Sequence, residues 1–435
     1  MKPYPKYKDS GVEWIGEVPE GWEVKKLKYC FSFHTGWTPP TTNSDYFIGD
    51  NTWITIADMK AKYLDDSVQK LSDEALNELR IKITKKGSLL YSFKLSVGKI
   101  AFAGKDLYTN EAILSISPME KYNLQYYFYT LPECLIKNAN ENIYGAKILN
   151  QYLIKNASLI VPPKPVQKSI AAYLDRKTAQ IDNLISTKQK LIELLKEERA
   201  AIINQAVTKG LNPDVPMKDS GIEWLGEIPA HWEVKRMKYV ARITLGKMLT
   251  NVDKGGYHYR PYLRAQNINW EKVNVEDVKK MWFSKDELRQ YRLNKNDLLV
   301  SEGGEVGRTS IWNEEIEECY IQNSVHKVTM EPTNDPFFFL YTFCLYGEKG
   351  VFESVVSRIS IAHLTKEKLK EIPFPMPPTD EQRRISKFIR SETTKIDQTI
   401  SKIKKQIDLL QEFRTALISE VVTGKIDVRD EGLNG

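Results

Sequence analysis

Two long stretches of the chain place apolar residues at the spacing of a helical stripe. Within 161–210 and again within 376–425, isoleucine and leucine recur at intervals of three, four and seven residues. The stripe consists of Ile170, Leu174, Ile181, Ile185, Ile192, Leu195 and Ile202 in the first stretch, and of Ile385, Ile389, Ile396, Ile400, Ile407, Leu410 and Leu417 in the second. The pattern predicts two helices of about 40 residues, each roughly 60 Å long.

Residues that disfavour helix bound both stretches. Proline pairs precede the two helices and glycines follow them: Pro162, Pro163, Pro377 and Pro378, then Gly210 and Gly424. A lone helix of roughly 60 Å would extend beyond a domain of about 150 residues, so each stripe needs a partner helix of equal length. Two copies related by a pseudo-twofold axis pack antiparallel, which predicts a coiled-coil rod with one domain at each end.

The two helical stretches belong to a repeat that spans the chain. Residues 8–29 and 218–239 are identical at 15 of 22 positions, at an offset of 210. The segment 159–163 recurs as 374–378, directly before the second helix. The order is therefore an opening segment, a variable middle, a proline pair and a long helix, followed by the same series again. The two middles have similar lengths but little common sequence.

The variable middles show mixed α/β patterns with many short strands. Strand-like runs occupy 53–56, 88–91, 262–264 and 297–300. Short helices, each capped by a serine, are predicted over 72–80 and 284–291, and apolar helices over 124–131 and 337–345. The predicted fold class is α/β (α+β): two globular domains joined by two long antiparallel helices, with a pseudo-twofold internal repeat.

Composition places the chain among ordinary globular proteins. Hydrophobic residues make up 41% and charged residues 28% of its 435 residues. No run approaches the roughly 18 apolar residues of a membrane span, and the first residues lack the apolar region of a secretory signal, so we expect a cytoplasmic protein with no membrane contact. The net charge of +6 is compatible with nucleic-acid binding.

The sequence contains no recognisable catalytic or metal-binding motif. It has no phosphate-binding P-loop, no dinucleotide glycine motif, no metalloprotease helix and no serine-nucleophile motif. The four cysteines, Cys30, Cys134, Cys319 and Cys344, form no C-x-x-C pair, which predicts buried or half-buried thiols rather than a zinc site or a disulfide. A duplicated chain of this kind favours binding over catalysis.

The opening segments carry the motif that relates the chain to a known family. The sequence W-I-G-E-V-P-E-G-W-E-V-K-K-L-K at 14–28 and its counterpart at 224–238 resemble the start of each target-recognition domain in the specificity subunit (HsdS) of type I restriction–modification enzymes. Residues 35–39 and 53–59 are similar to the family's first strand–loop block, and V-V-T-G-K-I-D at 421–427 is similar to its ending. The resemblance covers essentially the whole chain.

The resemblance implies a non-catalytic protein that binds double-stranded DNA. Each variable domain would read one half of a split, asymmetric target, and the helices would set the gap and dock two methyltransferase (modification, HsdM) subunits. Restriction (HsdR) subunits would complete the endonuclease, and S-adenosylmethionine, ATP and Mg²⁺ would belong to these partners. The chain would divide into target-recognition domain 1 (1–160), a first spacer helix (161–210), domain 2 (211–375), a second spacer helix (376–425) and a C-terminal tail (426–435).

Two other functions remain as alternatives. A coiled-coil scaffold that joins proteins and ignores DNA would not need two different, loop-rich middles of similar size. A self-contained restriction–methylation enzyme would need a methyltransferase motif of the type N/D-P-P-Y/F, and the sequence has none. Binding to a random duplex library separates the first alternative from the specificity subunit, because a scaffold would select no sequence.

Candidate DNA-contacting residues are polar and basic side chains in loops that recur in both middles. Such side chains suit phosphate contacts and the reading of base edges. In the first middle they are Lys94, Ser96, Lys99, Asn110, Tyr144 and Lys147. In the second they are Arg264, Gln266, Asn267, Glu302, Arg308, Gln322, Asn323, Arg358, Ser360 and His363. Each could instead be a solvated surface residue or a loop cap.

Four tryptophans of the opening segments invite a different interpretation. Trp14, Trp22, Trp224 and Trp232 recur beside glycine and proline in both copies. Exposed tryptophans can stack on nucleic-acid bases, but their recurrence in the matching parts of the repeat predicts a structural clasp.

Overall fold

The computed structural model describes residues 2–94, 96–141, 147–355 and 363–432. Contacts between residues divide the chain into two units. Unit 1 comprises Met1–Thr187 and Lys405–Gly435, and unit 2 comprises Lys188–Lys404. Each unit contains one variable middle and half of each long helix, whereas the repeat predicted five consecutive segments. That finer division stays a prediction.

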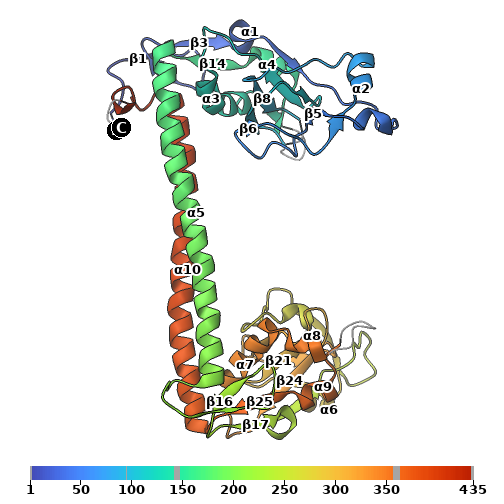
Figure 1. The fold of residues 1–435 in the computed structure, drawn as a ribbon. Helices are drawn as coiled ribbons and strands as arrows, with labels where there is room; N and C mark the ends of the chain where they lie inside the picture. The colour runs from blue at the N-terminus through green and yellow to red at the C-terminus, as the bar shows by residue number, and fades with distance from the viewer. Residues whose placement is uncertain (1, 95, 142–146, 356–362, 433–435) are drawn as a thin grey trace. The chain divides into compact units, whose positions relative to one another are not determined.

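Unit 1 is a mixed unit of short strands and helices (Figure 1). Its main sheet has five strands in the order β4-β11-β8-β9-β6, and a second sheet has the order β10-β5-β7. The strands are β1 Tyr7–Asp9, β2 Glu17–Pro19, β3 Glu23–Lys26, β4 Phe33–Thr35, β5 Asn51–Ile54, β6 Tyr63–Leu64, β7 Lys70–Leu71, β8 Leu89–Ser92, β9 Ile100–Ala103, β10 Tyr108–Thr109, β11 Ile113–Ile116, β12 Asn140–Glu141, β13 Lys147–Ile148 and β14 Ser158–Val161. The helices are α1 Leu27–Cys30, η1 Ser44–Phe47, α2 Asp73–Glu78, α3 Leu124–Ile136 and α4 Gln151–Asn156, followed by the start of α5 Lys164–Lys209.

Unit 2 repeats this arrangement with small changes. Its main sheet has the order β18-β24-β21-β22, and its second sheet has the order β20-β19-β23. The strands are β15 Met217–Asp219, β16 Glu227–Pro229, β17 Glu233–Arg236, β18 Ala241–Leu245, β19 His258–Leu263, β20 Lys279–Phe283, β21 Leu298–Ser301, β22 Thr309–Ile311, β23 Tyr320–Ile321, β24 Val325–Met330 and β25 Pro373–Met376. The helices are η2 Met237–Tyr239, η3 Ala265–Asn267, α6 Lys285–Tyr291, α7 Pro336–Glu348, α8 Val351–Val355 and α9 Lys366–Glu371, followed by α10 Thr379–Val422; the tail adds η4 Asp430–Gly432 to unit 1.

Four strands of the two main sheets match one for one, although their sequences differ, and β6 of unit 1 is an additional edge strand. The order β4-β11-β8-β9 of unit 1 corresponds to β18-β24-β21-β22 of unit 2. Strands β8 and β21 are buried at every position, as their continuous apolar runs require. The predicted strands and the predicted short helices are confirmed, and Ser72 and Ser284 cap α2 and α6 by accepting hydrogen bonds from backbone N–H groups. Three of the four cysteine thiols are buried and that of Cys344 is half-buried, as predicted.

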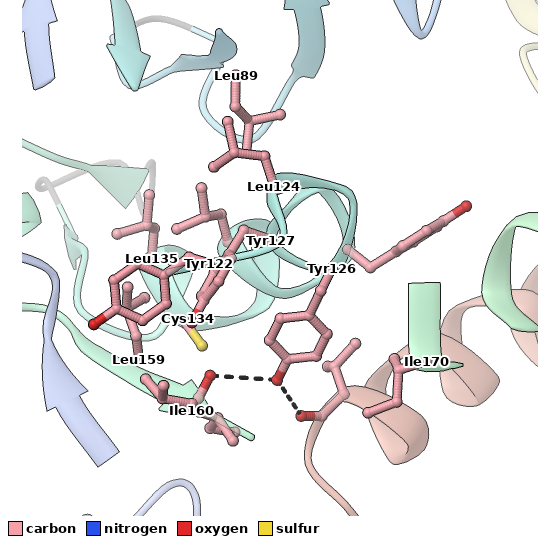
Figure 2. Packing of buried hydrophobic residues seen from close by; sticks show 14 of the residues in the cluster. Leu89, Tyr122, Leu124, Tyr126, Tyr127, Cys134, Leu135, Leu159, Ile160 and Ile170 are labelled. Atoms are coloured by element: carbon pink, nitrogen blue, oxygen red, sulfur yellow. Dashed lines mark hydrogen bonds between the residues drawn. The ribbon is translucent and has the colours of Figure 1, made fainter. Parts of the chain in front are cut away.

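The aromatic helix α3 fills the core of unit 1. Eight of its residues are buried, among them Tyr126 and Tyr127. The hydroxyl of Tyr126 donates toward two carbonyl oxygens, that of Ile160 at 3.3 Å and that of Val422 at 3.2 Å (Figure 2). Val422 lies at the end of α10, so the last turn of the second long helix is part of this core.

The stripes of the two long helices lie in the contact between them within each unit. Ile170, Leu174, Ile181, Ile192, Ile385, Ile389, Ile396, Ile407 and Leu417 are buried, and Ile185, Leu195, Ile202, Ile400 and Leu410 are half-buried. In unit 1 the first half of α5 packs with the last half of α10, and in unit 2 the last half of α5 packs with the first half of α10. The pairing is therefore antiparallel in each unit.

Two ion pairs repeat the symmetry of the helix contact. In unit 1 the guanidinium Nε of Arg414 lies 2.9 Å from a carboxylate oxygen of Asp182. In unit 2 the guanidinium Nε of Arg199 lies 3.1 Å from a carboxylate oxygen of Asp397. Arg199 also pairs with Glu271 at 2.7 Å, and this contact joins α5 to the variable middle of unit 2. Opposite charges at these positions fix the register of the two helices.

One tryptophan of each opening segment holds a helix end, as the predicted clasp requires. Trp22 and Trp232 are almost completely buried. Gly424, which has a φ of 78° just after α10, lies against Trp22, and Gly210, which has a φ of 73° just after α5, lies against Trp232. Both glycines have the left-handed conformation of a helix stop, so the predicted stops are confirmed as well.

A buried glutamine joins the start of each long helix to its unit. The side-chain amide of Gln167 donates to the carbonyl of Pro162 at 2.8 Å, and its oxygen accepts from the backbone N–H of Asn123 at 2.8 Å. Gln382 makes the same two bonds, to the carbonyl of Pro377 at 2.9 Å and from the N–H of Asp335 at 2.9 Å. Each glutamine thus connects the proline pair to the N-cap residue of the aromatic helix in its unit, α3 or α7.

We predict that Gln167→Leu and Gln382→Leu each lower the free energy of unfolding by about 2–4 kcal/mol, because each leaves a buried carbonyl and a buried N–H without a partner. Urea unfolding of the single variants measures this loss. Lys168→Ala is the control, because Lys168 is exposed on the same turn of α5. A change below about 0.5 kcal/mol in both glutamine variants would show that these bonds do not hold the helices in place.

Candidate nucleic-acid interface

Three loops meet at one edge of each unit, and we call them the rim loops. Rim loop 1 covers 55–59 after β5 in unit 1, and 264–269 after β19 in unit 2. Rim loop 2 covers 93–99 between β8 and β9 in unit 1, and 302–308 between β21 and β22 in unit 2. Residue 95 is outside the described residues. Rim loop 3 covers 110–112 in unit 1 and 322–324 in unit 2. Most candidate residues fall in these loops.

Backbone hydrogen bonds hold rim loop 3 between the other two in the same way in both units. In unit 1 the N–H of Asn110 donates to the carbonyl of Ile54 at 3.0 Å, and the N–H of Phe93 donates to the carbonyl of Ala112 at 3.0 Å. In unit 2 the N–H of Gln322 donates to Leu263 at 2.9 Å, and the N–H of Glu302 donates to Ser324 at 3.0 Å. Asn110 and Gln322 thus occupy corresponding places, as do Phe93 and Glu302.

A basic side chain connects rim loops 1 and 2 in both units. The ammonium of Lys99 donates to the carbonyl of Ile56 at 2.9 Å. The guanidinium of Arg308 donates to the carbonyl of Ala265 at 3.0 Å and pairs with Glu305 at 3.0 Å. These candidates are therefore both positive charges at the rim and supports of the loop backbone.

Ser324 organises the polar groups of the rim in unit 2. Its hydroxyl accepts from the N–H of Ala265 at 3.0 Å and donates to the side-chain oxygen of Gln322 at 2.6 Å. The amide nitrogen of Gln322 donates to the side-chain oxygen of Asn323 at 2.8 Å. The sequence-predicted pair Gln322 and Asn323 is thus brought together in a fixed arrangement, whereas Gln266 of rim loop 1 is exposed to solvent.

Two other candidates of rim loop 1 in unit 2 have structural partners. Asn267 is buried, and its side-chain nitrogen donates to the carbonyls of Asn274 at 2.9 Å and Asp277 at 3.1 Å. Arg264 forms an ion pair with Asp277. In this arrangement Asn267 shapes the loop and has no exposed amide with which to reach a base.

Glu302 and His363 form the acidic and imidazole part of the rim in unit 2. Glu302 is half-buried, and burial raises the pKa of its carboxyl above the ordinary value, while the charge of His363 opposes this shift. His363 is exposed and lies beside Gly303 of rim loop 2. A carboxylate here can accept a hydrogen bond from the amino group of cytosine.

The candidates of unit 1 are less concentrated. Lys94 and Ser96 are exposed in rim loop 2, and the side-chain oxygen of Asn110 accepts from the N–H of Ala112 at 3.2 Å. Lys147 lies in the β12–β13 hairpin and forms an ion pair with Glu141, so the structure does not bring it into the rim loops. Tyr144, Arg358 and Ser360 lie outside the described residues.

Three residues at or beside the rim were missed by reasoning from sequence. They are Ser324 and Glu111, which lie in rim loop 3, and Trp37, which precedes the loops in sequence. Glu111 forms a hydrogen bond with the hydroxyl of Thr38, next to Trp37. The strand register matches Asn110, Glu111 and Ala112 to Gln322, Asn323 and Ser324, and this correspondence is not visible in the two sequences alone.

The described residues show no group of three or more histidine, cysteine, aspartate or glutamate side chains that could hold a metal ion. Across the same part of the chain, no helix has the length and apolar character needed to cross a membrane. The rim is instead a set of hydrogen-bonding groups, several of them charged, on short loops fixed by a sheet.

A family model described as the type I restriction modification DNA specificity domain matches the chain twice, at residues 19–196 and 229–409. The type I restriction enzyme MjaIX specificity subunit of Methanocaldococcus jannaschii is 24% identical over 433 residues, which cover 96% of each chain. The EcoBI specificity subunit of Escherichia coli is 24% identical over 333 residues, or 73% of this chain and 69% of that protein.

Solved structures have the same fold. A chain from a study of complex assembly and conformational transition of the type I R-M system superposes with a TM-score of 0.72 at 15% identity, covering 94% of this chain and 99% of the other. The HsdS subunit from Thermoanaerobacter tengcongensis superposes with a TM-score of 0.56 at 15% identity, covering 94% and 98% of the two chains.

Rim loop 1 of unit 1 depends on the ionised carboxylate of Asp58. It accepts from the N–H and the hydroxyl of Thr55 at 2.8 and 2.7 Å and from the N–H of Val68 at 3.2 Å. Burial opposes ionisation, but these hydrogen bonds outweigh it and hold the pKa of Asp58 below its ordinary value. The stabilisation is therefore present at neutral pH and is lost as the pH falls through the lowered pKa.

We predict that Asp58→Asn is less stable than the wild type at neutral pH, and that the difference shrinks as the pH falls below about 4. Urea unfolding at a series of pH values measures the difference. Asp286→Asn is the control, because Asp286 is at an exposed position of α6. Asp106→Asn would not serve, because the carboxylate of Asp106 also accepts a backbone hydrogen bond. A stability difference that is constant over the whole pH range would contradict this role of the carboxylate.

Proposed function

Because the chain belongs to the type I restriction modification DNA specificity family, we propose that it is the specificity subunit of a type I restriction–modification enzyme and that each unit reads one half of a split DNA target. The observation that carries the proposal is the recurrence of the rim loops: the same three loops, held by the same backbone bonds, carry different side chains in the two units. A common frame with different contacts suits two unlike half-sites.

The polar side chains of the rim differ between the units, whereas its basic side chain is kept. Asn110 corresponds to Gln322, and Lys99 corresponds to Arg308. The half-buried Glu302 of unit 2 corresponds to Phe93 of unit 1, which is buried and offers no group to a base. Cations bind the phosphates of any sequence, while amides and carboxylates distinguish bases. The kept and the changed positions therefore support one shared mode of holding the duplex and two different readings of it.

The long helices support a role in spacing the two half-sites. Helix α5 has 46 residues and α10 has 44, which at about 1.5 Å per residue gives lengths of about 69 and 66 Å. Because base pairs are about 3.4 Å apart, helices of this length can separate two recognition sites by a gap of many base pairs. The helices would set the length of the gap, and the rim loops would determine which half-sites are bound.

The helices also expose apolar side chains to which partner subunits could bind. Leu184, Leu191 and Leu194 of α5, and Phe388, Leu409 and Phe413 of α10, are all exposed. Exposed apolar residues of this size are typical of protein contacts. We assign these helices to two methyltransferase subunits, which bind S-adenosylmethionine. Restriction subunits, which use ATP and Mg²⁺, would then join the complex in the cytoplasm, and this chain would contribute no catalytic group.

The proposal is tested by selecting DNA from a random duplex library with the chain bound to its methyltransferase partner at fixed salt. We expect two short, unlike motifs separated by a gap of constant length. Fixed salt is needed because phosphate contacts make the affinity strongly salt-dependent. Selection of no motif at any salt concentration would contradict the proposal and favour a scaffold that only joins proteins.

The corresponding amides provide a test of the division between the units. Asn110→Ala should relax base preference in one half-site only, and Gln322→Ala in the other half-site only. The affinity for the selected duplex should fall by roughly 5- to 150-fold, because a specific base contact contributes about 1–3 kcal/mol. Competition binding with duplexes mutated in either half measures this.

Lys105→Ala is the control for these variants, because Lys105 is an exposed lysine of unit 1 that lies outside the rim loops. It should leave both preferences unchanged. Loss of preference in both half-sites from a single amide substitution would show that the two units do not read DNA separately.

A further inference from the structure

Each unit exposes large apolar side chains directly beside rim loop 3. In unit 1, Trp37 is 55% exposed, two residues after β4. In unit 2, Met248 is 74% exposed, three residues after β18, and Leu249 and Val252 of the same loop are exposed as well. The two loops have different sequences, so what the units share at this place is exposed apolar surface and not a particular residue.

The backbone that carries Trp37 is fixed on both sides. Its N–H donates to the carbonyl of Thr109 at 2.9 Å, and its carbonyl accepts from the indole N–H of Trp53 at 3.1 Å. A Cβ at Gly36 would lie 1.8 Å from the carbonyl oxygen of Thr109, so only glycine allows this approach. Because Thr109 precedes Asn110, the exposed indole of Trp37 starts from a rigid point next to rim loop 3.

Unit 2 has the same anchor with a different residue. The N–H of Lys247 donates to the carbonyl of Ile321 at 3.0 Å, and the carbonyl of Lys247 accepts from the N–H of Asn323 at 2.9 Å. A Cβ at Gly246 would lie 2.4 Å from the carbonyl oxygen of Gln322. The side chain of Lys247 turns inward to pair with Glu287, and the exposed apolar residue is the next one, Met248.

We propose that Trp37 in unit 1 and Met248 with Leu249 in unit 2 are wedges that press between base pairs at the edge of each half-site. The inference rests on the proposed function and adds a way of reading DNA that uses no hydrogen bond. Apolar side chains held rigidly at a DNA-binding surface can enter a base step and partly unstack it, and the cost of unstacking depends on the sequence of that step.

The physical case for DNA as the occupant is continuity with the rim. Trp37 is bonded to Thr109, the residue directly before rim loop 3, and Met248 follows Lys247, whose carbonyl accepts from the N–H of Asn323 in rim loop 3. A duplex close enough for these amides to reach its bases would cover the adjacent apolar side chains. Burial against the base stack would then remove their apolar surface from water.

The two wedges should act differently. An indole ring can stack on an exposed base face, whereas methionine and leucine can only separate two bases. Each wedge should therefore favour easily deformed pyrimidine–purine steps, and Trp37 should hold the unstacked base more firmly.

The test uses the complex with its methyltransferase partner and the duplex obtained by selection, with 2-aminopurine placed in turn at each position of both half-sites. In the wild-type complex we expect increased fluorescence at one step at the edge of each half-site. Trp37→Ala should abolish the signal in the first unit's half-site only and weaken binding at least about fivefold, the lower end of one base–aromatic stack. Met248→Ser/Leu249→Ser should do the same in the other half-site.

Matched controls separate the wedge from a general loss of apolar surface. Tyr29 and Tyr239 are repeat-related, strongly exposed tyrosines outside these loops, and Tyr29→Ala and Tyr239→Ala should leave both signals unchanged. Trp37→Phe should keep most of the signal, which shows that loss in Trp37→Ala does not come from misfolding.

Three results would overturn the proposal. The first is the absence of any fluorescence increase in the wild-type complex. The second is an unchanged signal in both variants. The third is that the variants bind the methyltransferase partner more weakly but bind DNA as before, which would make the loops a protein contact. Each is distinguishable from failure of the proposed function, because in that case the wild type would select no split motif at all.

Discussion

Each domain core is closed by the last turns of the long helix that belongs to the other repeat. Val421 and Val422 of α10 lie in the core of unit 1, and Ile203 and Val207 of α5 lie in the core of unit 2. These side chains are almost completely buried, and apolar burial is the main favourable term in folding. Neither repeat can complete its core with its own residues, so both helices must be present, antiparallel and in register.

This exchange explains which parts of the two copies match. The tryptophan clasp, the helix-stop glycine and the buried glutamine all act where a helix end meets a core, and they recur in both units. Phe93 and Val306 of rim loop 2 belong to the same cores. The exposed side chains of the rim loops, such as Lys94 and Gln266, are free to differ as long as the strands and the backbone bonds between the loops are kept. Recognition and assembly are thereby carried by separate residues.

The sequence predicted the frame better than the rim. Heptad-like spacing, proline pairs and terminal glycines predicted both long helices, because an apolar stripe leaves a periodic signal. The spacing rule passed over Ile203, which is buried because the last turns of α5 also pack into the core of unit 2. It passed over Ile403 as well, which is also buried. The roles of Ser324 and Trp37 could not be predicted, since they depend on strand register across β10–β11 and β23–β24. Asn267 illustrates the opposite error: an amide typical of base reading is buried and bonds to the backbone.

We infer that the two variable middles are exchangeable DNA-reading parts on a common frame. The most direct measurement is DNA selection by a chain in which residues 240–370 are replaced by a second copy of 30–155, again bound to the methyltransferase partner. The account predicts that the asymmetric target becomes an inverted repeat of the first half-site, with the gap unchanged, because the helices pack antiparallel in each unit. Selection of the original asymmetric target by the exchanged chain would contradict it.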